Sequence, residues 1–191
     1  MHRRDAIRNV AILLGTAISA STLSALEGCT GSAPKNYDLH TPQTKTLVAE
    51  VAETIIPTTD TPGAKAGKVD EFIITMMNDC YKKADQDIFL DGLKKIDEAS
   101  KKKFSKVFLE LTPEQRTEIL TEIDKERVAY NKRENKKDGD PAHYFQFMKD
   151  LTLVGYFSSE PGATQALRYV RVPGKYDGCV PYKKGDKAWA S

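Results

Sequence analysis

The chain has 191 residues, of which 29 are Lys or Arg and 27 are Asp or Glu, so its formal net charge is only +2. Because there is no basic excess, nucleic acid is not expected as a partner. The three cysteines form no C-x-x-C pair, and no Cys/His set has the spacing of a zinc site or a haem attachment. The length suffices for one domain with a substantial core.

The first 28 residues have the pattern of an export signal. Arg3 and Arg4 are followed by Ile7 and Arg8, and then by an uncharged stretch of apolar residues diluted by small ones. The stretch is too diluted for a strong membrane anchor. The arginine pair resembles a twin-arginine signal, with Ala6 where a Phe is commoner; the alternative is an ordinary secretory signal. Twin-arginine export carries folded proteins, so a small exported chain without a cofactor motif is expected to escort a partner through the translocase.

The end of this segment resembles a lipoprotein cleavage site. Leu26 and Gly28 precede Cys29 as in such sites, although Glu27 fits poorly. We predict a flexible tether over residues 29–40. Either Cys29 is lipidated and holds the protein at a membrane surface in the periplasm, or it is a plain cysteine near a cleavage site.

Residues 41–191 are predicted to form a single all-α domain. Thr41 and Pro42 are an N-cap and a first helical residue, and Pro57 ends the helix that they begin. A stiff, turn-rich loop follows over residues 57–64. Apolar residues at helical spacing then predict a second helix, with these positions in its buried stripe: Val69, Phe72, Ile73, Met76 and Cys80.

The second half of the domain is also predicted to be helical. A helix is expected over residues 86–109, somewhat weakened by Gly92. Thr112, Pro113 and Gln115 then make a capping box that begins another helix. An exposed charged loop is predicted over 131–140, a last apolar helix over 141–157, and a turn-rich tail over 158–191 with one helical turn at 163–169. The fold class is therefore an α-helical bundle with long turn-rich loops and an irregular C-terminal tail.

The sequence contains no recognisable catalytic motif. After the signal the only histidines are His40 and His143, which we interpret as surface or packing residues. Hydrolase, metalloprotease, P-loop and dinucleotide-binding patterns are missing. We therefore assign no catalytic, cofactor-binding or metal-binding residue to this chain.

The turn-rich segments are better candidates for function, as partner contacts. Aromatic side chains stand beside turn residues at 155–163 and again at 172–182. Aromatic residues on rigid loops are effective interface anchors, and long loops are usually functional or disordered.

Three stretches of the sequence resemble the gluconate 2-dehydrogenase subunit 3 family, the small subunit of membrane-associated flavin dehydrogenases. They are residues 53–64, 151–160 and 162–179, and they bracket most of the chain from 41 to 182. The likeness is weakest in the charged middle, residues 82–140.

The resemblance implies a partner that performs the chemistry. In such systems a large subunit of the glucose–methanol–choline (GMC) oxidoreductase type binds FAD and oxidises a sugar or sugar acid, and a cytochrome c subunit with haem c can accept the electrons. The small subunit carries the twin-arginine signal and takes the folded flavoprotein across the membrane. The family name does not determine the substrate here.

Two groups of residues are the candidate contacts with this large subunit: Pro57, Thr59, Asp60, Thr61, Pro62 and Gly63 in the first loop, and Gly155, Tyr156, Phe157, Tyr169 and Tyr176 toward the C-terminus. Two alternatives stay open. The tail could complete the partner's active site or electron path, or the chain could be a stand-alone exported lipoprotein that binds some other molecule.

The two remaining cysteines are disulfide candidates. Cys80 is predicted to be buried on the inward stripe of its helix, and Cys179 to be exposed in a glycine-rich turn. The alternatives are a bridge between them, a bridge from Cys179 to the large subunit, or neither.

Overall fold

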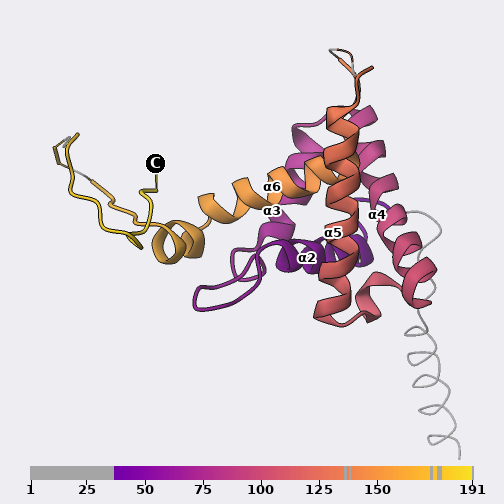
Figure 1. Ribbon diagram of the computed structural model, residues 1–191, viewed down its shortest axis with the longest axis horizontal. Coiled ribbons are helices and arrows are strands. Elements are labelled where there is room, and N and C mark those ends of the chain that lie inside the picture. Colours follow the sequence, from indigo (N-terminus) through magenta and orange to yellow (C-terminus); the bar gives the residue numbers. More distant parts are fainter. Residues whose placement is uncertain (1–36, 136, 138, 173, 176–177, 191) are drawn as a thin grey trace, which may run out of the picture. The chain divides into compact units, whose positions relative to one another are not determined.

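The computed structural model describes residues 37–135, 137, 139–172, 174–175 and 178–190 (Figure 1). All of them belong to one compact unit, Pro34–Ser191. The export-signal residues Arg3 and Arg4 and the lipidation candidate Cys29 lie outside the described residues, so their roles stay predictions.

The described part of the chain is helical, as predicted. Its α-helices are α2 (Pro42–Ile55), α3 (Val69–Asp79), α4 (Lys83–Phe104), α5 (Pro113–Lys132) and α6 (Tyr144–Ser158), joined by the 3₁₀-helix η1 (Phe108–Glu110) and followed by the π-helix η2 (Gly162–Ala166). No strand occurs among the described residues, which contain one isolated β-bridge, Arg168–Trp189. The all-α fold class is confirmed.

Helix α6 occupies the centre of this arrangement. It packs against α2, α3, α4 and α5, and Figure 1 shows α5 crossing it. The sequence of α6 explains this position, because its apolar residues cover more than one face and a helix of that kind must be surrounded by others.

Two predicted helix starts are confirmed by their caps. Thr41 Oγ1 accepts a hydrogen bond from the backbone N–H of Thr44, and Pro42 is the first residue of α2. At the start of α5, Thr112 and Gln115 exchange reciprocal side-chain to backbone bonds of 3.4 and 3.1 Å. This capping box satisfies two backbone donors that the helix itself leaves without partners.

The long helix predicted over 86–109 is interrupted, which corrects the sequence interpretation. Helix α4 ends at Phe104 because Ser105 adopts a left-handed conformation with φ 58°, and a short η1 follows. Gly92 has a packing role that the sequence did not reveal, since a Cβ there would lie 2.5 Å from the Tyr144 ring. The glycine therefore permits the close approach of α6 to α4.

The predicted tether is too long at its C-terminal end. Tyr37 and Leu39 are buried in the core, only 7% and 6% exposed. The Tyr37 hydroxyl donates to buried Asp97 Oδ2 at 2.5 Å, and Asp97 Oδ1 accepts from the Phe108 backbone N–H. Burial and the neighbouring Asp97 raise the pKa of Tyr37 far above its ordinary value. The folded domain thus includes residues before Thr41, because their apolar side chains cover the core.

Candidate partner-binding site

The loop between α2 and α3 is held in place by one carboxylate. Glu53 Oε1 accepts from the backbone N–H of Thr58 at 3.0 Å and from its hydroxyl at 2.7 Å, and Glu53 Oε2 accepts from the Lys65 backbone N–H at 2.9 Å. Hydrogen bonds to an ionised acceptor are stronger than neutral ones. A single side chain on α2 therefore fixes both arms of this segment, residues 57–68, which we call the anchored loop.

Gly63 permits the loop to close over Glu53. A Cβ at this position would lie 2.4 Å from Glu53 Oε1 and 2.6 Å from the Thr58 backbone nitrogen, distances that no side chain tolerates. The next residue, Ala64, is fully buried and its N–H donates to the carbonyl of Ile56 at 3.0 Å. The predicted contact residue Gly63 is thus required by packing within the loop.

An ionic cluster ties the anchored loop to α5. Glu50 contacts Lys65 Nζ at 2.6 Å and Arg116 Nη1 at 2.5 Å, and Arg116 also donates to the carbonyls of Phe108 and Leu109. Burial raises the pKa of Glu50, but the hydrogen bond from Lys65 and the charge of Arg116 outweigh burial and hold that pKa below its ordinary value. The carboxylate is therefore stabilised in its ionised form.

The structure brings two of the predicted contact regions together. The Tyr156 hydroxyl, at the end of α6, donates to the carbonyl of Pro62 at 2.6 Å across 94 positions of sequence. Tyr156 is predicted as an aromatic partner contact beside turn residues, but it is only 2% exposed and is not available to a partner. The reason is that α6 continues through this region to Ser158, so Gly155 and Tyr156 lie on its inward side, with Gly155 against the Phe72 ring.

The exposed part of this region is a small surface around the loop tip. Residues 57–60 are exposed, while Thr61 and Pro62 are half-buried. On α6, Phe157 packs edge-on against Tyr156 and is exposed, as are Leu153 and Val154, which sequence analysis missed. The sequence does contain a sign of these exposed residues. Apolar residues occur on all sides of α6, including sides that do not pack against another helix.

The C-terminal segment begins with a close contact to α6. A Cβ on Gly162, at the start of η2, would lie 1.8 Å from the Tyr156 carbonyl oxygen. Beyond η2, Tyr169 is exposed as predicted. Tyr176 lies outside the described residues, and its role as a contact stays a prediction.

The cysteines differ from expectation at one position. Cys80 is a free, exposed thiol, not a buried one. It is the C-cap of α3, where the helix has ended and the side chain no longer follows the buried stripe; Met77 is buried in that stripe instead. Cys179 is exposed, as predicted.

His143 has a structural role in the described chain, in agreement with its interpretation as a packing residue. Its Nδ1 accepts from the Phe145 N–H at the start of α6, and its ring stacks on Tyr144 with centroids 4.3 Å apart. Burial lowers the pKa of His143, although nearby Glu126, whose Oε1 is 3.7 Å from Nε2, raises it. The lowered pKa favours the neutral imidazole, the form in which Nδ1 can accept the Phe145 N–H.

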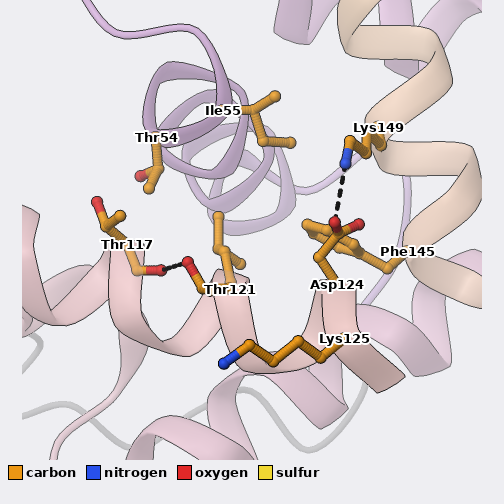
Figure 2. A pocket seen from close by; sticks show the side chains of 9 residues that line it. Thr54, Ile55, Thr117, Thr121, Asp124, Lys125, Phe145 and Lys149 are labelled. Atoms are coloured by element: carbon orange, nitrogen blue, oxygen red, sulfur yellow. Dashed lines mark hydrogen bonds and ion pairs between the residues drawn. The ribbon is translucent and has the colours of Figure 1, made fainter. Parts of the chain in front are cut away.

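A pocket of about 280 Å³ lies elsewhere, between α2, α5 and α6 (Figure 2). Figure 2 shows two interactions among the residues that line it. Lys149 pairs with Asp124 at 2.9 Å, and the Thr121 hydroxyl donates to the Thr117 carbonyl at 2.7 Å. None of the predicted contact residues lines this pocket, and we assign it no function.

Among the residues that the structure describes, no group of three His, Cys, Asp or Glu side chains is placed to hold a metal ion. In the same part of the chain, no helix is both long and apolar enough to cross a membrane.

The fold and site define a small helical protein. Its candidate binding surface consists of ordered loops near the C-terminal end of the central helix α6. The profile of the family described as gluconate 2-dehydrogenase subunit 3 matches residues 42–174, and the chain belongs to this family. No curated protein and no solved structure matches the chain.

Proposed function

We propose that this chain is the non-catalytic small subunit of an exported FAD-dependent dehydrogenase that oxidises a sugar or sugar acid. The observation that carries the proposal is the family match, which runs from the start of α2 into the C-terminal segment. It includes the helical core, the anchored loop and the start of the C-terminal segment. The family is described as a dehydrogenase subunit, and we extend that association to this chain.

The use of polar residues in the structure supports a binding role. Asp97 and Glu53 accept backbone hydrogen bonds that hold neighbouring segments, Tyr156 holds Pro62, and His143 caps α6. These polar side chains hold loops and helix ends in place, so they stabilise the fold. A fold with a well-defined surface suits an accessory subunit that binds a partner without large rearrangement.

The export signal supports the second part of the proposal. Arg3 and Arg4 resemble a twin-arginine signal, and that route carries folded proteins. We propose that the chain takes the folded, FAD-loaded large subunit into the periplasm through the translocase. A lipidated Cys29 would then keep the complex at the membrane, where a cytochrome c subunit can accept its electrons.

Purification of the tagged full-length chain from its own host tests the association. Mass spectrometry is expected to identify a GMC-type flavoprotein, and the complex is expected to show the absorption spectrum of bound FAD. Recovery of the chain without any flavoprotein would instead favour the stand-alone lipoprotein.

Co-expression tests the escort role. With the wild-type chain, active flavoprotein is expected in the periplasm; with Arg3→Lys and Arg4→Lys together, it should remain in the cytoplasm. Arg8→Lys, outside the arginine pair, is the matched control. Normal export of the flavoprotein in the absence of this chain would rule the escort role out. In the same strains Cys29→Ser should release the complex from the membrane fraction.

A further inference from the structure

The C-terminal segment forms a loop that closes on itself. The Arg168 backbone N–H donates to the Ala188 carbonyl at 2.8 Å, and the Ala190 N–H donates back to the Arg168 carbonyl at 3.0 Å. The Arg168 guanidinium lies over the Trp189 ring, 3.8 Å from its centroid. We call the described residues of this segment, 168–172, 174–175 and 178–190, the closed loop. Two backbone bonds and a cation–π contact join its ends, so it is a defined surface feature.

This closed loop carries much of the exposed apolar surface of the described chain. Six of the ten large apolar side chains that are exposed belong to it: Tyr169, Val170, Val172, Val180, Tyr182 and Trp189. Val172 and Tyr182 are the most exposed, at 77% and 76%. Valine and tyrosine in the helices are mostly buried, so the concentration of apolar surface here indicates a site of interaction.

The closed loop also differs from the helices in charge. Residues 168–191 contain six Lys or Arg and two Asp or Glu, a net charge of +4, whereas residues 37–167 contain 19 and 23, a net charge of −4. In that part of the chain, basic side chains such as Lys45 on α2, Lys65 in the anchored loop and Arg116 on α5 are paired with carboxylates. Among the described residues, no carboxylate lies within 4.0 Å of the basic groups of Arg171, Lys183 or Lys184.

We propose that the closed loop docks on an acidic face of the flavoprotein large subunit, with Val172 and Tyr182 inserted into apolar pockets of that face. This proposal rests on the proposed function. The charge would supply orientation and a fast encounter, and the apolar side chains would supply most of the binding energy.

An anionic membrane is the competing occupant, since basic and aromatic residues also bind lipid headgroups. The family match favours the protein, because it extends to residue 174 and so includes the first arm of the closed loop in the subunit 3 domain. Docking on a protein also explains why the ends of the loop are joined, since a fixed loop loses less conformational entropy when it docks on a matching surface.

The test is the affinity of the purified full-length chain for its flavoprotein. Charge reversal of Arg171, Lys183 and Lys184 to Glu is expected to raise the Kd about 100-fold, and Val172→Ser with Tyr182→Ser about 30-fold. The matched control reverses three exposed lysines at the end of α4 and just after it, Lys101, Lys102 and Lys106, and should change the Kd less than about threefold.

Two further measurements keep the outcomes distinct. The wild-type Kd should rise with salt concentration, and this dependence should flatten in the loop charge variant. Circular dichroism should show unchanged thermal unfolding for every variant. If wild-type protein binds the flavoprotein and the loop variants bind equally well, docking at the closed loop is wrong while the proposed function stands; if wild-type protein does not bind, the proposed function itself fails.

Vesicles containing phosphatidylglycerol distinguish the membrane. The Cys29→Ser protein, which cannot be lipidated there, should not float with such vesicles through its closed loop. Vesicle binding that the loop variants abolish, with flavoprotein binding unaffected, would overturn the proposal in favour of a lipid contact.

Discussion

The anchored loop, residues 57–68, and the described residues of the closed loop come from segments that are alike in sequence, but they differ in structure. Both are rich in turn-forming residues, and both contain predicted partner contacts. The anchored loop is bound to the helices through Glu53 and Tyr156. The closed loop has its two ends bound to each other, and its apolar residues remain exposed.

The difference shows that turn composition alone does not reveal whether a loop is attached. Attachment depends on groups outside the loop, and one of them, Tyr156, is 94 positions away from the carbonyl that it holds. A loop attached in this way can present a rigid tip. The closed loop is held mainly through its own ends, with one further hydrogen bond from Lys187 Nζ to the Gln165 carbonyl of η2, and its apolar side chains stay exposed.

Gly162→Ala should be the most damaging substitution, because its Cβ would overlap the Tyr156 carbonyl oxygen at 1.8 Å. Backbone movement at the junction of α6 and the closed loop is expected to lower the free energy of unfolding by about 3 kcal/mol. Chemical denaturation measures this. Gly139→Ala, where φ is +93° and no atom lies within 4 Å, isolates backbone strain and should cost about 1 kcal/mol. Equal losses in the two variants would contradict the contact.

Glu53→Ala should detach the anchored loop. The substitution removes three hydrogen bonds to Thr58 and Lys65, and we expect a loss of about 2 kcal/mol in the free energy of unfolding. Limited proteolysis should show new cleavage within residues 57–68. Glu98→Ala, an exposed carboxylate on α4, is the control and should change neither readout. Unaltered resistance to protease in Glu53→Ala would show that the loop does not depend on the carboxylate.

Tyr156→Phe should remove a single hydrogen bond that attaches the anchored loop to α6. The ring remains packed, and only the hydroxyl donor to the Pro62 carbonyl is lost, at a cost of about 1 kcal/mol. Thermal unfolding compared with Tyr169→Phe, whose side chain is exposed in the closed loop, separates the two segments. The comparison between the loops fails if both substitutions have the same effect.

Acidification should destabilise the cap of α6 at His143. Because burial lowers the folded-state pKa below its ordinary value of 6.5, the unfolded chain takes up the proton first. The neutral His143 therefore contributes its full share of the folding stability above pH 6.5. This share is lost as the pH falls from 6.5 toward the folded-state pKa. Protonation of Nδ1 also removes the acceptor for the Phe145 N–H.

The loss of stability on protonation of His143 should be smaller than the ~1 kcal/mol that a typical N-cap contributes. Denaturant unfolding of wild type and His143→Asn, which keeps an acceptor but does not titrate, measures it at about pH 8 and about pH 5. Identical pH dependence in both proteins would exclude His143 as the source.

Val172→Ser together with Tyr182→Ser should have the smallest effect on stability, below about 0.5 kcal/mol, because neither side chain is buried. Val48→Ser, which introduces a hydroxyl in the core, is the matched contrast and should cost about 2 kcal/mol or more. Differential scanning calorimetry of the isolated chain checks both. A large loss in the double variant would mean that the closed loop packs on the helices after all.

The sequence by itself determined the helical class, the starts of α2 and α5, and the family. Thr41, Pro42 and the Thr112–Gln115 box act within one turn of chain, so their effect is visible in the local sequence. The repeat of apolar residues is equally local and identified the helices, although their ends were less certain where no cap was present.

Only the tertiary structure decided which of the candidate residues are available to a partner. Ser105 breaks a helix that its neighbours would continue, Cys80 is exposed where the stripe ends, and Tyr156 is buried beneath Pro62. The burial of Tyr156 depends on a contact between segments that are distant in sequence, and such a contact leaves no periodic signal. The helix ends at Cys80 and Ser105 carry no glycine or proline that would mark them in the sequence. The charge pairs of Lys45, Lys65 and Arg116 also join residues that are distant in sequence. The sequence therefore could not show that these cations are paired while Arg171, Lys183 and Lys184 have no carboxylate nearby among the described residues.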